Sequence, residues 1–430
     1  MSNASPLFRC HGCGATVDIA HRQPYACPNI GIDGDVDHVL VAPSGDDRFA
    51  NGPDANPFLR YRGLLSPYRL ARSAGLSDEA WAEIVGRLDR ALIAIDGRGF
   101  RITPMLPQEV LAKAAGFNGV LWVKDETVNV SGSHKARHLM GIMLYLRVLE
   151  TARLAVGEGV RARRLAIASC GNAGLAAAVI ARATDWPLDV FIPPDVPESI
   201  VRRLKELGAS VNICARVQGE TGDPCVRSFR LAVDGGSIPF GVQGPTSGLA
   251  VEGGRTLAFE MAEQFGATGV SPDAVYVQVG GGALASALAQ GFDVAAVRDV
   301  VEHLPRLMLV QTAGCAPLVR AWQLMSQLEL SAAAQYRHRF MWPWETVPTS
   351  IAHGILDDET YDWWEAAKGM RDTGGRPSVA DEEALYRANA LARAHTAINV
   401  SATGSAGLAG LLDVGGQDRH AAVIFSGVER

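Results

Sequence analysis

Short apolar runs alternate with helical patterns through the middle of the chain. The apolar runs are bounded by glycine, proline and polar residues, which is typical of buried strands that connect to helices. We predict strands at 165–168, 188–192, 211–215 and 238–242. Because strands that alternate with helices favour a parallel sheet, residues 153–240 are expected to form a compact α/β unit. The pattern also predicts a surface loop at 44–57 and helix at 67–92.

A lysine follows a small polar turn and begins an apolar helical pattern. The run 131–137 reads SGSHKAR, and Leu139, Ile142 and Met143 follow it. Partial burial and nearby unpaired N–H groups are expected to lower the pKa of Lys135 and favour its free amine. A free amine can form a Schiff base with an aldehyde. On its own, the motif would indicate only an ordinary helix start.

Three other segments each end an apolar strand in a small or polar loop. Residues 165–174 (LAIASCGNAG) and 275–283 (VYVQVGGGA) predict a strand, a tight turn and a helix start. Residues 422–427 (AVIFSG) predict a terminal strand that ends in a hydroxyl. Small residues let backbone N–H groups converge on an anion, and a glycine run can curl around a phosphate. Each segment alone is explained equally well by an ordinary turn between strand and helix.

Taken together, the four segments resemble the fold-type II family of pyridoxal-phosphate enzymes, the tryptophan synthase β-like superfamily. The chain is most similar to the threonine synthase and threonine dehydratase branch, from about Thr103 to the C-terminus. Supporting stretches are KDE at 124–126, EGGRTLAFE at 252–260 and QTAGCAPL at 311–318. The chain departs from the common motif at His134, where phenylalanine is usual, and at Cys170, where serine is common.

The resemblance implies a role for each matched residue. Lys135 would hold pyridoxal 5'-phosphate as an aldimine and then remove the α-proton of the substrate. Asn172 would bind the 3′-oxygen of the cofactor, and Ser426 would meet its pyridine nitrogen. The phosphate would be cradled by Gly280, Gly281, Gly282 and Ala283. The substrate carboxylate would face Ser169, Cys170, Gly171 and Ala173.

The residue opposite the pyridine nitrogen indicates the reaction. Ser426 is a neutral hydroxyl and does not force protonation of the ring, so expulsion of a leaving group is favoured over transamination. We therefore predict a lyase (a dehydratase or deaminase) that catalyses β-elimination from a β-hydroxy or β-substituted amino acid through an aminoacrylate-type intermediate. Alternatives are threonine synthase-type γ-elimination with water addition, a β-replacement synthase, and a pyridoxal-phosphate-binding protein without turnover. A phosphorylated substrate needs cations, for which Arg137, Lys124 and Arg255 are available.

The resemblance also implies an architecture of two doubly wound parallel-sheet domains. Residues 51–145 and 246–430 would form the large cofactor-binding domain, and 146–245 a small mobile α/β domain. The amino-acid substrate would bind in the crevice between them. A homodimer is expected from the resemblance.

Composition is consistent with a small-molecule enzyme. Of 430 residues, 48% are hydrophobic and 20% are charged, and the formal net charge is −6. A basic stripe is not visible, so nucleic acid is not expected as a partner. Apolar runs fall short of the roughly 18 residues of a membrane span, so no membrane partner is expected. The absence of a secretory signal and seven scattered cysteines predict a cytoplasmic location.

The N-terminal residues 1–50 resemble a degenerate zinc ribbon. Cys10 and Cys13 form a C-x-x-C motif, but Cys27 is followed by Ile30 where a fourth cysteine would stand. A fourth ligand could come from a neighbouring residue: His11, His21, His38 or Asp35. We expect a metal-free remnant, with a bound zinc ion as the alternative.

Overall fold

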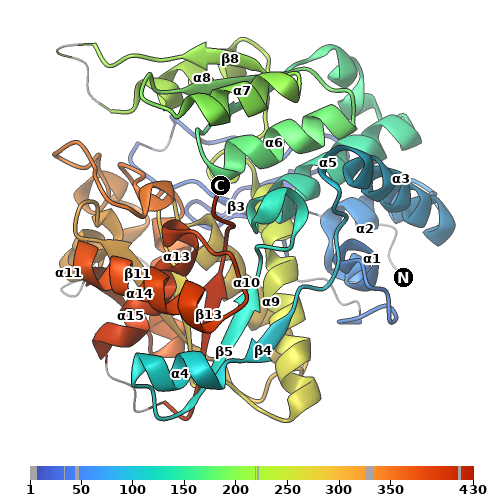
Figure 1. The fold of residues 1–430 in the computed structure, drawn as a ribbon. Helices are drawn as coiled ribbons and strands as arrows, with labels where there is room; N and C mark the ends of the chain where they lie inside the picture. Colours follow the sequence, from blue (N-terminus) through green and yellow to red (C-terminus); the bar gives the residue numbers. More distant parts are fainter. Residues whose placement is uncertain are drawn as a thin grey trace.

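The computed structural model describes residues 7–32, 34–43, 48–217, 219, 222–325, 333–414 and 418–430. Its elements form two parallel sheets and a small N-terminal sheet. Figure 1 shows the smaller parallel sheet and its helices in green at the top, above the larger sheet. The C-terminus lies between these two parts.

The smaller sheet has the strand order β8-β7-β6-β9, and all of its pairs are parallel. Its strands are β6 (Leu165–Ala168), β7 (Leu188–Ile192), β8 (Ser210–Ile213) and β9 (Ile238–Pro239). Helices α6 (Asn172–Ala183), α7 (Glu198–Glu206) and α8 (Pro224–Asp234) connect them. The first two strands lie at the predicted residues. The other two are shorter than predicted, since only Ile238 and Pro239 of the last run pair with β6.

The larger sheet has the order β12-β11-β10-β13-β5-β4, and only the edge strand β4 is antiparallel. Its strands are β4 (Met105–Pro107), β5 (Val120–Asp125), β10 (Ala274–Gln278), β11 (Arg306–Thr312), β12 (Arg376–Ala380) and β13 (His420–Phe425). Alternate residues of β10 enter different cores: Val275 and Val277 pack on one face, and Ala274 and Tyr276 on the other. Side chains on both faces are therefore buried, as expected for a central parallel strand.

Helices cover both faces of the larger sheet. One face carries α9 (Gly248–Thr268), α10 (Ala283–Ala296), α11 (Pro317–Met325) and α13 (Trp363–Thr373). The other carries α4 (Glu109–Ala115), α14 (Glu382–His395) and α15 (Ala402–Val414). The described elements thus confirm the predicted α/β class. Both sheets lie in the segments predicted for the two domains, whose boundaries and relative movement stay predictions.

Helix α5 (Lys135–Ala152) packs between the two parts of the molecule. It lies on α9 on one side and on α6 on the other. The contact with α9 is made by backbone, because a Cβ atom at Gly141 would lie 2.4 Å from the carbonyl oxygen of Leu249 and 2.9 Å from the Cα atom of Gly253. The start of α5 is therefore fixed relative to the larger sheet.

The N-terminal region contributes short helices and a small sheet. The predicted helical stretch 67–92 is two helices, α2 (Ser66–Ser73) and α3 (Asp78–Asp96), which are separated where Ser77 caps the second. Before them, α1 (Pro57–Arg60) follows the predicted loop. The sheet has the order β2-β1-β3 and consists of β1 (Leu7–Cys10), β2 (Thr16–Asp18) and β3 (Leu40–Val41). No helix in the described part of the chain has the length and apolar character needed to cross a bilayer.

Candidate active site

A cavity of about 280 Å³ lies where the carboxyl ends of strands from both parallel sheets meet. This is the place where open α/β sheets bind ligands. All residues that the sequence predicted for the site line it: Lys135, Ser169, Cys170, Gly171, Asn172, Ala173, Gly280, Gly281, Gly282, Ala283 and Ser426. The fold thus brings the four sequence segments to one place, while the role of each residue stays a prediction.

Lys135 is the first residue of α5 and is fixed by the end of β13. The preceding Ser133 forms a bridge with Gly427, and the His134 N–H donates to the carbonyl oxygen of Ser426 at 3.2 Å. Burial lowers the pKa of Lys135, and the carboxylates of Asp357 and Asp362 act in the opposite direction. A lowered pKa increases the fraction of free amine, which is the form that reacts with an aldehyde.

The loop after β6 turns sharply into α6. A Cβ atom at Gly174 would lie 2.3 Å from the carbonyl oxygen of Ser169, so this turn requires glycine. Asn172 begins the helix, and its Oδ1 accepts a hydrogen bond from Arg430. The side chain of Asn172 also lies against Gly427. The first N–H groups of α6 therefore face the cavity beside the end of β13, where they can bind a carboxylate.

The glycine loop after β10 leads into α10. Gly282 has a φ of 91°, a backbone conformation that side chains rarely adopt. A Cβ atom at Gly280 would lie 2.3 Å from an Oδ atom of Asp357 and 2.8 Å from the Cα atom of Ile355. The Asp362 N–H donates to the carbonyl oxygen of Gly281 at 2.9 Å. The segment 355–362 therefore covers the glycine loop. It packs so closely that the loop positions have no room for a side chain.

Asp357 is a site residue that the sequence did not reveal. Its half-buried carboxylate accepts a hydrogen bond from the backbone N–H of Gly281, and burial raises its pKa while Lys135 lowers it. Asp358 and Glu359 follow it directly, so the sequence gives no signal that distinguishes which of these three acids lines the cavity. Only the path of the chain over the glycine loop selects Asp357.

Ser426 follows β13 and is paired with Gln278, which the sequence also did not select. Gln278 Nε2 faces the carbonyl oxygens of Gly404 at 2.9 Å and Ile424 at 3.1 Å, and these acceptors fix the orientation of the amide. The same Nε2 donates to Oγ of Ser426. Since this bond uses a lone pair of the hydroxyl oxygen, the hydroxyl hydrogen is available to another acceptor.

The cations named for a substrate phosphate lie elsewhere. Arg137 pairs with Glu126 at 2.7 Å and with Glu260, and Lys124 pairs with Glu260 at 2.7 Å. Arg255 pairs with Glu252 at 3.1 Å. All three cations are buried in these pairs and are not among the described residues that line the cavity.

The cavity fits pyridoxal phosphate. It offers a partly buried lysine, two helix N-termini with small loops, and a hydroxyl hydrogen without an assigned acceptor. In the described part of the chain, His134 Nε2 and Gln278 Oε1 are buried at this cavity and lack a hydrogen-bond partner. Such atoms are costly unless a ligand or water satisfies them.

Comparisons with known proteins support this assignment. Residues 98–427 match the family model described as "Pyridoxal-phosphate dependent enzyme". A mouse protein named "Serine dehydratase-like" is 31% identical over 217 residues, which are 50% of this chain and 57% of the mouse protein. A threonine synthase from Methanosarcina acetivorans is 28% identical over 76% of this chain and 74% of its own length.

Solved structures show the same fold. A fungal L-serine ammonia-lyase from Rhizomucor miehei superposes with a TM-score of 0.57 over 76% of this chain and 94% of its own, at 18% identity. The chain spans little more than half the length of the mouse relative that it matches. The family match covers most of the chain and confirms the cofactor that the sequence predicts. This chain therefore belongs to the family of pyridoxal-phosphate dependent enzymes.

Proposed function

We propose that this protein is a lyase that removes a β-hydroxyl or similar β-substituent from an amino acid. The observation that carries the proposal is the pair Gln278 and Ser426, which presents a neutral hydroxyl at the position predicted for the pyridine nitrogen. When bound, pyridoxal phosphate supplies an aldehyde for the substrate amine and a ring that withdraws electrons from the α-carbon. A hydroxyl partner moderates this withdrawal and favours loss of a β-substituent.

Residues on three sides of the cavity divide the remaining tasks. Lys135 Nζ would hold the cofactor and, once released, accept the α-proton, and its lowered pKa favours the uncharged amine that this step needs. The loop with Ser169, Cys170, Gly171 and Ala173 would bind the substrate carboxylate through the N-terminus of α6. Asn172 would orient the cofactor ring by a hydrogen bond to the 3′-oxygen of the cofactor.

The phosphate would lie against the glycine loop, where α10 adds its dipole and the N–H of Gly281 is bound by Asp357. Asp357 shares this place. A charged carboxylate beside a phosphate is unfavourable, whereas a protonated one can donate a hydrogen bond to it. The raised pKa of Asp357 favours the protonated form.

Threonine synthase-type chemistry is the second candidate, because a threonine synthase aligns with most of both chains. A substrate phosphate would require a cationic partner. The described residues that line the cavity include no arginine, and the buried cations Arg137, Lys124 and Arg255 are held by carboxylates. These contacts favour β-elimination from a substrate without a phosphate.

Two further expectations belong to the proposal. A homodimer and a cytoplasmic location follow from the resemblance and the composition, and gel filtration with light scattering would decide the first. We also propose that the segment 146–245 moves as a unit when substrate binds, since the cavity is lined by both sheets.

The visible absorption spectrum of the purified protein tests the function. Wild type should show a band of bound cofactor that changes with one class among serine, threonine, other β-hydroxy amino acids and O-phospho amino acids. With that class, ammonia and a 2-oxo acid should form in equal amounts, and Lys135→Ala should form neither. Lys113→Ala, on the exposed side of α4, is the matched control.

Other products would replace the proposal. Release of inorganic phosphate from an O-phospho amino acid without formation of ammonia or a 2-oxo acid would support the threonine synthase-type reaction instead. A new amino acid formed only with an added nucleophile would indicate a β-replacement synthase. A stable cofactor band that no amino acid changes would indicate a binding protein without turnover.

A further inference from the structure

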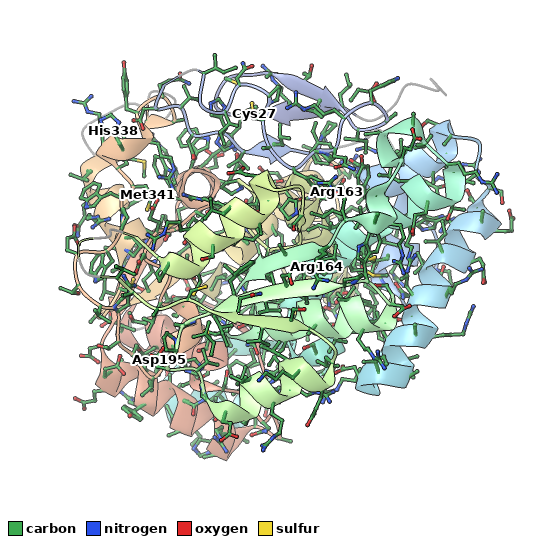
Figure 2. All side chains as sticks on the ribbon, turned by 90° about the horizontal axis from the view of Figure 1, so that it is seen from above. Cys27, Arg163, Arg164, Asp195, His338 and Met341 are labelled. Carbon is green, nitrogen blue, oxygen red and sulfur yellow. The ribbon has the colours of Figure 1, made fainter. Side chains whose placement is uncertain are left out.

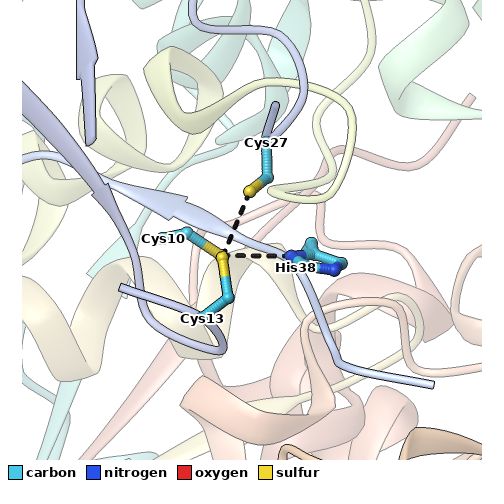
Figure 3. A group of neighbouring side chains, drawn as sticks. All are labelled: Cys10, Cys13, Cys27 and His38. Carbon is cyan, nitrogen blue, oxygen red and sulfur yellow. Dashed lines mark hydrogen bonds between the residues drawn. The ribbon is translucent and has the colours of Figure 1, made fainter. Parts of the chain in front are cut away.

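The three N-terminal cysteines lie with one histidine in a compact cluster outside the active site. The ligand atoms of Cys10, Cys13, Cys27 and His38 all lie within 4.8 Å of one another. Cys13 Sγ is 3.5 Å from Cys27 Sγ, and Cys10 Sγ is 3.5 Å from His38 Nδ1. Figure 3 shows the four side chains pointing toward a common centre. We propose that these four residues bind one structural zinc ion.

The geometry is close to that of a bound ion. Four ligands arranged as a tetrahedron around zinc, with Zn–S bonds of about 2.3 Å, have neighbouring sulfurs about 3.8 Å apart. The Cys13–Cys27 sulfur separation of 3.5 Å is slightly below this value, and no two ligand atoms of the cluster are more than 4.8 Å apart. Small side-chain rotations would therefore complete the site. Three thiolates and one imidazole form a closed ligand set typical of structural zinc.

Groups around the sulfurs support thiolates at this place. The backbone N–H of Asn29 donates to Cys27 Sγ at 3.4 Å, and its Nδ2 donates to Cys13 Sγ at 3.6 Å. N–H donors to metal-bound sulfur orient the ligands and stabilise their negative charge. Cys10, Cys27 and His38 are themselves buried, so a metal would be shielded from water.

The fold selects His38 from the alternatives that the sequence left open. His11 Nδ1 lies 2.9 Å from Glu365, and His21 Nδ1 lies 3.1 Å from Asp18. Asp35 contacts His338 through its side chain. Ile30, at the position of the missing cysteine, is 53% exposed. His38 thus takes the place of the fourth cysteine from a different point in the sequence, which favours the alternative of a bound zinc ion over the expected metal-free remnant.

A metal here would tie the N-terminal segment to the catalytic part of the molecule. Figure 2 shows the segment with Cys27 lying along one edge, between Arg163 and His338. Arg163 Nη1 donates to Gln23 Oε1 at 2.8 Å, and the His338 N–H donates to Asp35 at 2.9 Å. The N-terminal segment is therefore attached to the rest of the molecule at two places. A zinc ion here would have a structural role, since all four coordination positions are taken by protein ligands.

The cluster is also connected to the glycine loop through few contacts. A Cβ atom at Gly244 would lie 3.0 Å from Val39, the residue after His38. The Gly244 N–H donates to the carboxylate of Asp362, whose own N–H donates to Gly281. We therefore expect loss of the metal to weaken cofactor binding without removing any residue that contacts the cofactor.

Metal analysis of the purified full-length protein tests the proposal. Wild type should contain about one zinc ion per chain after gel filtration, and Cys13→Ser and Cys27→Ser should lose it. His38→Cys should retain it, because a fourth thiolate completes the same tetrahedron. Two matched controls should also keep the ion: His11→Gln, which changes a histidine beside the cluster, and Cys214→Ser, which changes a cysteine far from it in sequence.

Cobalt substitution of the wild type keeps the test decisive if the cysteine variants do not fold. Demetallated, reduced protein titrated with Co²⁺ should develop thiolate charge-transfer bands and the intense visible bands of a tetrahedral site at one equivalent. Metal-free protein that binds neither zinc nor cobalt would overturn the proposal. So would a Cys13–Cys27 disulfide in freshly purified protein, or zinc that persists when Cys13 and Cys27 are both replaced.

Discussion

Gln278 donates a hydrogen bond to Oγ of Ser426 from an amide whose orientation is fixed by two backbone carbonyls. Gln278 ends β10 and Ser426 directly follows the neighbouring strand β13, and both residues line the cavity. The hydroxyl hydrogen of Ser426 therefore points away from Gln278 and is available to another acceptor. Ser426 would then donate a hydrogen bond to the pyridine nitrogen predicted to lie against it.

Removal of this donor should slow turnover. Ser426→Ala should lower kcat about 10-fold, which corresponds to the loss of a hydrogen bond of about 1.4 kcal/mol in the transition state. Steady-state kinetics with the amino acid that changes the absorption spectrum would measure the decrease in kcat. Ser405→Ala is the matched control, because it removes a buried hydroxyl on α15 that does not line the cavity. Equal loss of activity in both variants would assign Ser426 to stability alone.

Cofactor affinity should depend on the protonation of Asp357. Because burial raises the pKa of this carboxyl, deprotonation begins above its ordinary range and places a negative charge beside the phosphate. The Kd for pyridoxal phosphate should therefore increase as pH rises in wild type and change less in Asp357→Asn. Equilibrium titration at several pH values measures it. If Asp357→Asn shows the same pH dependence of Kd as wild type, the charge of Asp357 does not affect binding of the phosphate.

Stability should decrease with rising pH because of Asp362. Burial raises the pKa of this carboxyl from 3.8 to about 7, helped by Asp37 and Glu365, while the Gly244 N–H and His11 lower it. The folded state then holds a proton that the unfolded state has lost between these pH values. Its contribution to the free energy of unfolding is greatest below pH 4 and is lost as pH rises to about 7.

Asp362→Asn should remove this dependence. Its free energy of unfolding relative to wild type should increase from pH 4 to pH 7, by at most about 4 kcal/mol for a shift of three pKa units. Denaturant unfolding at both pH values measures the difference. Asp195→Asn, at an exposed carboxyl, should show no such trend. A pH-independent difference for Asp362→Asn would contradict the prediction.

Loss of a charge from the buried ion pairs around Glu260 should lower stability more than loss of an exposed charge. Glu260 binds both Lys124 and Arg137, and all three side chains are buried. Glu260→Gln leaves two cations with one fewer anion and should lower the free energy of unfolding by about 3–5 kcal/mol. Thermal denaturation monitors it. Glu83→Gln, which breaks exposed pairs with Arg87 and Arg90, should lower the free energy of unfolding far less.

The sequence predicted the segments of the site well, because each segment is local. Lys135, the glycine loop and Ser426 stand at the ends of strongly patterned strands or helices, so their positions follow from short-range rules. The strands β6 and β7 lie at the predicted residues for the same reason. Strand β9 is shorter than its apolar run, since its length is set by pairing with β6.

Long-range partners could not be predicted from the sequence. The patterns did not show that Arg137 and Lys124 are held by Glu126 and Glu260, which made them candidates for a substrate phosphate. Asp357 reaches the glycine loop only because a later segment folds over it. The selection of His38 over nearer histidines likewise depends on where β3 lies relative to β1.

The backbone contact between Gly141 and Gly253 has a consequence for mutational scanning. Neither glycine lines the cavity or can be trimmed further, yet any side chain at either position would separate α5 from α9 and displace Lys135. A saturation library scored by turnover should therefore show both positions as intolerant as Lys135 itself. A ranking by intolerance to substitution alone would place these two glycines among the catalytic residues. Their role is only to leave room for the close contact between α5 and α9.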